Sequence, residues 1–265
     1  MDPVLRHQRN VAKLDGRGIA VASYPGAGAA LLGNIFLELG LDYVDPYTED
    51  LDEDGVARPA PDRLEYRRRL AASAHRDERL RPPGTLRLIK THLLPQDFPE
   101  LRGLLLLVRD PRDTLFSYYN WRLAFSEEGE NRDFHGFLSS SFPLGLRPVD
   151  DWTRFYRLWM SALEEFAGKV ALVRFERLKS EPDAEVCRVL NAFGLPISRA
   201  NVISAVKAST FDSMRLHEDR NASGPSRIMR RGMHGEWVEW YTEETAKYFS
   251  DTSFRLLAHR LGYDL

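Results

Sequence analysis

Short apolar runs alternate with helical stripes along this chain. Four runs rich in Ala, Val, Leu and Ile have the length and composition of buried parallel strands, at residues 19–23, 86–89, 101–108 and 170–175. After the first run, Leu32, Ile35, Phe36 and Leu39 recur at helical spacing, and Gly40 is suited to end that helix. The alternation predicts an α/β fold, a parallel sheet flanked by helices, in a single domain over residues 1–265.

Further helices are expected in the second half of the chain. One begins near Pro111, because proline suits the first turn of a helix. An aromatic stripe over residues 152–166 indicates a helix that faces the core, and residues 182–193 form another helix closed by Gly194. After a short helix that ends near Ser209, a polar loop is expected, and the last helix runs to Leu261.

Polar segments interrupt this pattern. Residues 1–16 predict an N-terminal arm, and residues 41–61 and 126–150 predict two variable surface loops, the second long enough to cover a site. Asp62 and Glu65 predict a capped helix start. The arginine-rich helix that follows, from Arg63 to Arg79, presents either a solvated face or a docking surface for an acidic protein partner or carrier.

Composition narrows the classes of function. The 265 residues carry a formal net charge of −2, which gives no general attraction to nucleic acid or to a membrane surface. Cys187 is the single cysteine, and no Cys/His cluster has the spacing of metal ligands, so we expect no disulfide and no metal. A polar start and the lack of a long apolar run predict a cytoplasmic protein that does not enter the membrane.

The loop between the first strand and its helix, residues 24–28, reads Tyr-Pro-Gly-Ala-Gly. Free backbone N–H groups at a helix N-terminus attract an anion such as phosphate, although Gly26 and Gly28 are equally compatible with a tight turn alone. The loop is P-loop-like without being a Walker A loop, because Asn34 stands where lysine would follow glycine. It is not a dinucleotide fingerprint either, because Leu31 replaces the third glycine.

Three predicted strands end in groups that suit an anion site. Gly26 and Gly28 follow the first strand, Lys90 and His92 the second, and Arg109 the third. Ligands of open α/β sheets bind beyond the carboxyl ends of the strands. We therefore expect these five residues to face one crevice.

Three motifs in this order resemble the sulfotransferases that use 3′-phosphoadenosine 5′-phosphosulfate (PAPS). They are IKTHL at residues 89–93, VRDPRDTLFSYYNW at residues 108–121 and IMRRGMHGEW at residues 228–237. The resemblance covers nearly the whole chain. It implies the P-loop-like sulfotransferase fold, PAPS as donor, 3′,5′-ADP as product, no metal, and a small-molecule acceptor.

The resemblance also assigns roles to residues. Arg109 and Ser117 look like the pair that holds the nucleotide 3′-phosphate, and Arg230, Arg231 and Gly232 resemble the basic turn that closes on it.

The remaining roles concern the adenine ring and the chemistry. Phe211 matches an aromatic residue that stacks on adenine, and Phe175 stands where the family usually has tyrosine. Lys90 matches a lysine near the transferred sulfuryl group, and His92 matches the general base that accepts the acceptor's proton.

The glycine loop departs from the family pattern Tyr-Pro-Lys-Ser-Gly-Thr-Thr-Trp. Gly26 replaces the lysine, alanines stand at 27, 29 and 30, and Leu31 replaces the tryptophan. Each lost hydrogen bond to a charged group is worth about 1.5–3 kcal/mol. The 3′-phosphate half of the site is therefore kept, while the half that activates the sulfuryl group is stripped.

Two main hypotheses follow, and a third is weaker. The chain is a sulfotransferase that transfers the sulfuryl group from PAPS to a hydroxyl or amine of a small molecule in bacterial metabolism. Alternatively it is a pseudo-sulfotransferase, either a non-catalytic subunit or an enzyme that expels sulfate from a sulfated substrate by elimination or cyclisation. A nucleotide kinase of related fold is disfavoured by the missing Lys and Ser/Thr.

Overall fold

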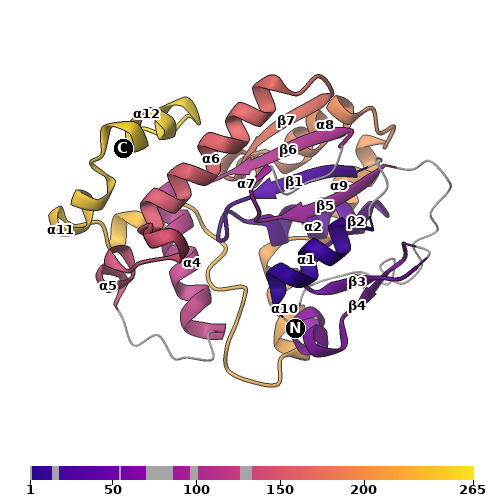
Figure 1. Cartoon of the computed structure of the whole chain (residues 1–265). Coiled ribbons are helices and arrows are strands. Elements are labelled where there is room, and N and C mark those ends of the chain that lie inside the picture. The colour runs from indigo at the N-terminus through magenta and orange to yellow at the C-terminus, as the bar shows by residue number, and fades with distance from the viewer. Residues whose placement is uncertain (1, 14–17, 54, 70–85, 96–100, 126–132) are drawn as a thin grey trace.

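A parallel sheet lies at the centre of the molecule (Figure 1). The computed structural model describes residues 2–13, 18–53, 55–69, 86–95, 101–125 and 133–265. Among these residues the sheet has five strands, all parallel to their neighbours. In spatial order they are β2 (Asp42–Val44), β5 (Arg87–Thr91), β1 (Gly18–Ser23), β6 (Gly103–Val108) and β7 (Lys169–Arg174). The four predicted strands are confirmed to within two residues at each end, and β2 was not predicted.

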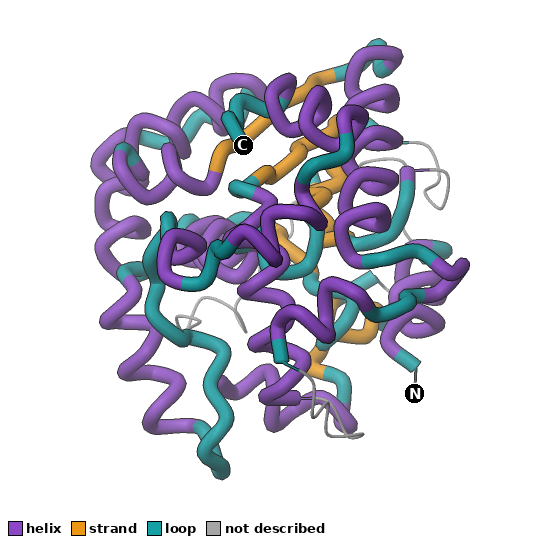
Figure 2. The backbone as a smooth tube through the Cα atoms, turned by 90° about the vertical axis from the view of Figure 1, so that its left-hand side faces the viewer, coloured by secondary structure: helices purple, strands orange, loops and turns teal. Residues whose placement is uncertain are grey.

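Alternate residues of the central strands face opposite layers of helices. In β1, Ile19 and Val21 pack into one apolar cluster, and Ala20 and Ala22 into the other. Figure 2 shows helices on both sides of the strands. The Ile19 side is covered by α2 (Ala29–Glu38), α8 (Pro182–Phe193) and α9 (Arg199–Ala208), and the Ala20 side by α4 (Pro111–Phe125), α6 (Pro148–Glu165) and α12 (Thr252–Arg260).

The predicted helices are confirmed where the apolar periodicity is strong. Trp152 and Trp159 of α6 are buried, as their stripe predicts. Gly194 ends α8 in the left-handed conformation, with φ of +69°. Phe175, predicted to end a strand, instead begins the short helix α7 (Phe175–Ser180), so its ring lies at the carboxyl edge of the sheet.

The N-terminal arm and the first variable loop are more ordered than predicted. Residues 1–16 contain helix α1 (Pro3–Val11), and residues 41–61 contain β2 and the antiparallel pair β3 (Glu49–Leu51) and β4 (Ala57–Pro59). Asn10 of α1 joins the two segments, because its side chain donates to the Glu49 carbonyl and accepts from the Leu51 amide. Several of the acidic residues that predicted a solvated loop are paired instead, as Asp42 is with Arg87 at 2.9 Å.

The second variable loop, residues 126–150, was also expected to be irregular. Residues 126–132 lie outside the described part of the chain, and the rest contains regular structure. Residues 133–148 include α5 (Phe134–Ser139) and the 3₁₀ helix η4 (Pro143–Gly145). Phe134, Phe137 and Phe142 are buried in an aromatic cluster that outweighs the polar content of the segment.

A helix does begin near Asp62, but the predicted capping box of Asp62 and Glu65 is wrong. The chain there forms η1 (Pro61–Arg63) and α3 (Leu64–Arg69), and these acids bind elsewhere. Asp62 pairs with Arg6, and Glu65 accepts from Ser223. The predicted docking surface from Arg63 to Arg79 lies beyond Arg69 outside the described residues.

The polar loop expected after Ser209 contains α10 (Phe211–Asn221), which Thr210 caps. The C-terminal part then forms η5 (Glu236–Glu239), α11 (Glu243–Ala246) and η6 (Lys247–Phe249) before α12. Among the described residues, no helix combines the length and the apolar character needed to cross a bilayer.

Candidate active site

The glycine loop is packed so closely that side chains do not fit at either glycine. Gly26 and Gly28 have φ of +87° and +99°, in the region that favours glycine. A Cβ on Gly26 would lie 2.4 Å from the Thr114 carbonyl oxygen, and one on Gly28 would lie 2.3 Å from the ring of Phe175. Gly28 is the N-cap of α2 and provides no side chain to bind the first-turn N–H groups. No described residue accepts from the N–H of Gly28, Ala29 or Ala30, so these groups remain available to an anion.

Arg109, directly after β6, joins this loop to the segment at residues 228–237. Its Nη1 donates to the Gly26 carbonyl at 3.1 Å, and its Nη2 donates to the Met233 carbonyl at 3.0 Å. The guanidinium carbon lies 4.6 Å from the centre of the Phe175 ring. The residue is 5% exposed, and this burial lowers the pKa of Arg109 despite the nearby carboxylates.

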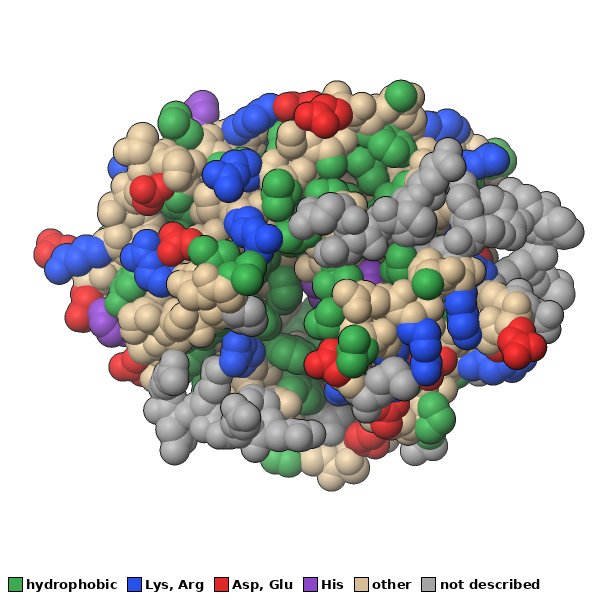
Figure 3. Space-filling view, in the orientation of Figure 1, with side chains coloured by type: hydrophobic (Ala, Val, Ile, Leu, Met, Phe, Trp, Pro, Cys, Tyr) green, Lys and Arg blue, Asp and Glu red, His purple; other side chains and the backbone are tan. Residues whose placement is uncertain are grey.

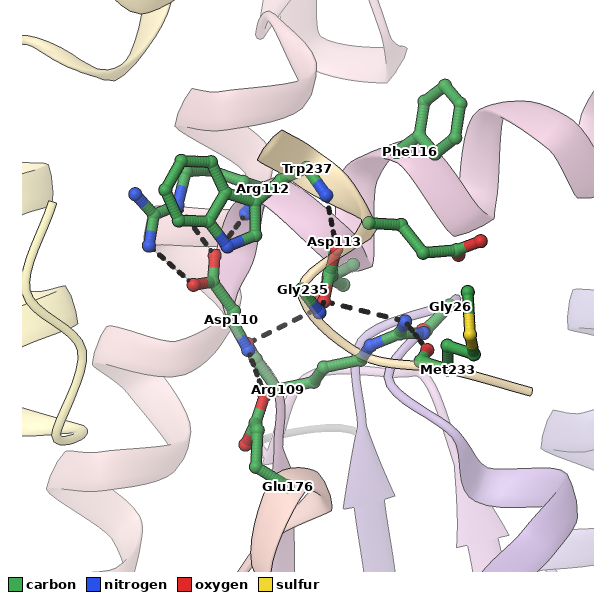
Figure 4. A network of polar contacts seen from close by, with 12 residues as sticks. Gly26, Arg109, Asp110, Arg112, Asp113, Phe116, Glu176, Met233, Gly235 and Trp237 are labelled. Atoms are coloured by element: carbon green, nitrogen blue, oxygen red, sulfur yellow. Dashed lines mark hydrogen bonds and ion pairs between the residues drawn. The ribbon is translucent and has the colours of Figure 1, made fainter. Parts of the chain in front are cut away.

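Asp113 holds the other end of the same network (Figure 4). One turn into α4, its carboxylate accepts from the N–H groups of Gly235 and Trp237 at 2.6 and 2.9 Å. It also lies 3.7 Å from Nη2 of Arg109. Burial raises the pKa of Asp113, against the opposing effect of Arg109 and the two amides. The segment at residues 228–237 is thereby fastened beside the glycine loop.

The two arginines of that segment bind acids of the chain rather than facing the glycine loop together. Arg230 pairs with Glu236, and its guanidinium carbon lies 5.1 Å from the ring of Phe116. Arg231 donates to Glu239 at 2.7 Å. In this structure, the arginines of the predicted phosphate-binding turn are therefore engaged in ion pairs with nearby acids of the chain.

The remaining predicted nucleotide residues lie in two groups. Ser117 is beside the glycine loop, since its Cβ is 3.3 Å from a Cβ placed on Gly26, and no described residue is bonded to its hydroxyl. Phe211 packs against Gly232, where a Cβ would lie 2.1 Å from its ring. The structure thus brings Gly26, Gly28, Arg109, Ser117 and Phe175 together, and it pairs Phe211 with Gly232.

His92 lies at the carboxyl end of the sheet, next to the start of the glycine loop. Its Nδ1 is 2.6 Å from the Ser23 carbonyl oxygen, and Ser23 is the last residue of β1. A carbonyl only accepts, so Nδ1 carries the proton and the neutral ring keeps a lone pair on Nε2. Burial, reinforced by the positive charge of Lys90, lowers the pKa of His92 to about 3. The imidazole is therefore neutral near pH 7, as a proton acceptor must be.

Lys90 is the penultimate residue of β5 and is held by an acid that the sequence did not indicate. Its ammonium lies 2.8 Å from Oδ2 of Asp45, and both side chains are largely buried. Burial by itself would raise the pKa of Asp45, but the charge and hydrogen bond of Lys90 lower it overall. The lysine is thus restrained by an ion pair.

The side chains that hold the predicted site residues in place were not predicted from the sequence. Asp113 had a signal, because it follows Arg109 by four residues at a helix start. Asp45 had none, because it follows β2, whose pairing with β5 is not visible in the sequence. Among the described residues, no three His, Cys, Asp or Glu side chains gather as a metal site would require.

A cavity of about 240 Å³ borders the network of Arg109 and Asp113. Two of its acidic lining residues are paired within the protein. Glu176 accepts from Tyr263 at 2.8 Å, and Asp110 pairs with Arg112 at 2.6 Å. The cavity adds no predicted site residue.

Known proteins resemble this chain in sequence and in fold. A family model described as "Sulfotransferase domain" matches residues 17–259. Sulfotransferase 6B1 of Danio rerio is 26% identical over 194 residues, which cover 68% of this chain and 63% of that relative. The matched region thus spans less than two thirds of that relative's length.

Two solved structures show the same fold. Mouse sulfotransferase SULT7A1 complexed with PAP has a TM-score of 0.65 at 15% identity, and the match covers 97% of this chain and 94% of that one. Retinol dehydratase in complex with androsterone and the inactive cofactor PAP has a TM-score of 0.64 at 17% identity, with 99% and 87% covered. Because the family model matches most of this chain, residues 17–259, the chain belongs to the sulfotransferase family.

Proposed function

We propose that this protein transfers a sulfuryl group from PAPS to a hydroxyl or amine of a small molecule. Arg109 and Ser117 would hold the 3′-phosphate, with Arg230, Arg231 and Gly232 closing over it. Phe175 and Phe211 would flank the adenine, and Gly26 and Gly28 would face the 5′-phosphosulfate. The solved neighbours that contain PAP support this choice of nucleotide.

One observation carries the proposal. The hydrogen bond from His92 Nδ1 to the Ser23 carbonyl ties a neutral imidazole to the strand that leads into the glycine loop. Ser23 precedes Gly26 by three residues, so the base and the free N–H groups of α2 lie at the same strand end. A proton acceptor beside an anion site is the arrangement that attack on a phosphosulfate needs.

In the proposed reaction, one bond to sulfur forms as another breaks, and His92 takes up the proton that is released. The acceptor oxygen or nitrogen forms a bond to sulfur as its proton passes to Nε2 of His92. The bond between sulfur and the bridging oxygen breaks, and its electron pair leaves with the 5′-phosphate of 3′,5′-ADP. Lys90 and the N–H groups at the start of α2 would stabilise the negative charge that develops.

The acceptor is proposed to carry an apolar body. Figure 3 shows a hollow on one face, with hydrophobic side chains on its walls. Aromatic side chains also pair within α4 and between α3 and α4, as Tyr118 does with Trp121 at 6.3 Å and Tyr66 with Phe125 at 5.8 Å between ring centres. Structural neighbours are described with androsterone and with retinol, which supports an acceptor of this class.

A second candidate function has its own support. Gly26 leaves no room for the lysine of the family pattern, and Lys90 is neutralised by Asp45. A site without a free lysine at the bridging oxygen suits a pseudo-sulfotransferase, either a non-catalytic subunit or an enzyme that expels sulfate from a sulfated substrate by elimination or cyclisation. One solved neighbour is itself named a dehydratase, which supports activities other than transfer on this fold.

The experiment is transfer of ³⁵S from labelled PAPS to a panel of apolar alcohols and amines, with His92→Asn as the matched control. Transfer by the wild type that the control lacks supports the proposal. If PAPS gives no transfer while sulfated members of the panel release sulfate without nucleotide, the second function replaces the first.

A further inference from the structure

The turn that follows β2, residues 45–49, is fixed by its own hydrogen bonds. The Asp45 carbonyl accepts from the N–H groups of Thr48 and Glu49 at 3.0 and 2.9 Å. Oδ1 of Asp45 accepts from the N–H of Tyr47 at 3.1 Å, and Glu49 Oε2 accepts from the N–H of Asp45 at 2.9 Å. The turn therefore holds its side chains in one arrangement without any ligand.

Tyr47 of this turn covers the imidazole of His92. The two rings are stacked, with centres 5.1 Å apart and planes 28° apart. The Tyr47 hydroxyl also accepts from the backbone N–H of His92 at 2.8 Å. His7 of α1 lies near the same tyrosine, with 4.9 Å between ring centres.

Asp45, two residues earlier, holds Lys90 from the same turn. The register explains how: Val44 of β2 lies opposite Ile89 of β5, so the next residues on each strand are Asp45 and Lys90. The ammonium also lies 5.6 Å from the centre of the Tyr47 ring. One short turn thus touches both residues assigned to the chemistry.

We propose that the 45–49 turn is the positioning element of the active site, with Tyr47 holding the imidazole of His92 and Asp45 holding the ammonium of Lys90. The inference rests on the proposed function, in which His92 accepts the acceptor's proton. Neither Tyr47 nor Asp45 is a catalytic residue, because each acts through its neighbour.

The electrostatics of the imidazole provide a readout that is independent of turnover. The charged or titratable groups around it are Lys90 on β5, Asp45 in the turn and His7 on α1. Burial is the main cause of the low pKa of His92, followed by Lys90, while Ser23 and Asp45 oppose the decrease. The ring of Tyr47 supplies part of that burial, so its removal should admit water and raise the pKa of His92.

The experiment compares Tyr47→Leu and Tyr47→Phe with the wild type by ¹⁵N spectroscopy of histidine-labelled protein. Tyr47→Leu should raise the pKa of His92 by about one unit or more toward its usual ~6.5. Its kcat should fall about tenfold, with unchanged affinity for 3′,5′-ADP, because only the base is misplaced. The matched control is Tyr248→Leu, since Tyr248 contacts a different histidine, His135, at 3.2 Å.

Tyr47→Phe isolates the hydroxyl. It keeps the stacked ring, so the pKa and tautomer of His92 should stay as in the wild type, whereas the His92 amide should exchange its hydrogen faster. This arm decides the matter even if the leucine variant does not fold.

Two results overturn the inference. One is a His92 pKa, tautomer and kcat in folded Tyr47→Leu that match those of Tyr248→Leu. The other is an unchanged amide exchange rate in Tyr47→Phe. If the wild type transfers no sulfuryl group, the proposed function fails separately, and the spectroscopic results still decide whether the turn positions the imidazole.

Discussion

The two halves of the candidate site are built in opposite ways. On the base side (Asp45, Tyr47, Lys90 and His92), hydrogen bonds within the protein leave the working atom, Nε2 of His92, with its lone pair available. On the nucleotide side (Gly26, Gly28, Arg109, Arg230 and Arg231), the arginines bind groups of the protein itself. Arg109 donates to two backbone carbonyls, and Arg230 pairs with Glu236.

This difference indicates what a ligand must do on each side. The base side is assembled before any ligand arrives, so binding changes little there. On the nucleotide side, a phosphate must replace carbonyl and carboxylate partners that already satisfy the arginines. Breaking the bonds to those partners requires free energy, which lowers the affinity for the nucleotide. Such a loss is expected of a site that closes over its ligand.

The largest effect is expected on the base side. His92→Asn removes the proton acceptor and should lower kcat by about 100-fold or more, while the affinity for nucleotide stays within about twofold. Steady-state kinetics together with a binding titration separate the two quantities. Equal losses of affinity and turnover would show that the two sides are not independent.

The next effect concerns the nucleotide side. Arg109→Ala should weaken binding of 3′,5′-ADP by about 2 kcal/mol, or roughly 30-fold, because charge-assisted hydrogen bonds are lost. Arg102→Ala is the control, since Arg102 is exposed before the start of β6, at the opposite edge of the sheet. Calorimetry on both variants checks this, and equal affinities would remove Arg109 from the phosphate site.

The glycine loop should resist substitution. Gly26→Ala should lower the free energy of unfolding by about 2 kcal/mol or more, because a left-handed backbone and an overlap with the Thr114 carbonyl both oppose a side chain. Gly40→Ala is the matched control. Its φ is also positive, at +72°, but nothing lies within 4 Å, so only about 1 kcal/mol is expected. Urea unfolding measures both, and a Gly26→Ala loss no greater than that of Gly40→Ala would show that the loop has room.

The smallest effect tests the self-pairing of the nucleotide side. Glu236→Gln frees Arg230 from a competing carboxylate and should tighten 3′,5′-ADP binding by about 1 kcal/mol, or roughly fivefold. Glu239→Gln is the control, because it removes only the more exposed pair with Arg231. Weaker binding in Glu236→Gln would mean that this carboxylate orders the segment for the ligand rather than competing with it.

Much of the sheet and part of the site could be predicted from the sequence. Apolar runs gave the positions of β1, β5, β6 and β7, and residues that follow such runs lie at one edge of the sheet. His92 and Arg109 were predicted to face one crevice for that reason alone. Their placement at the carboxyl ends of β5 and β6, the two strands that flank β1, needs no side-chain detail.

The partners of these residues could not be predicted, because they depend on pairing between distant segments. Strand β2 is three residues long and begins with Asp42, whose charge conceals a buried strand until Arg87 is seen beside it. Asp45 meets Lys90 only through the register of β2 with β5. Arg230 and Glu236 lie six residues apart in an irregular segment, where no periodicity indicates an ion pair.

Titration calorimetry of 3′,5′-ADP into the wild-type protein decides whether the nucleotide side is a 3′-phosphate site held shut by its own ion pairs. We expect saturable binding that is lost with adenosine 5′-phosphate, which lacks the 3′-phosphate, and that is tightened by Glu236→Gln. Absence of any heat of binding with millimolar 3′,5′-ADP, for the wild type and for Glu236→Gln alike, would contradict it.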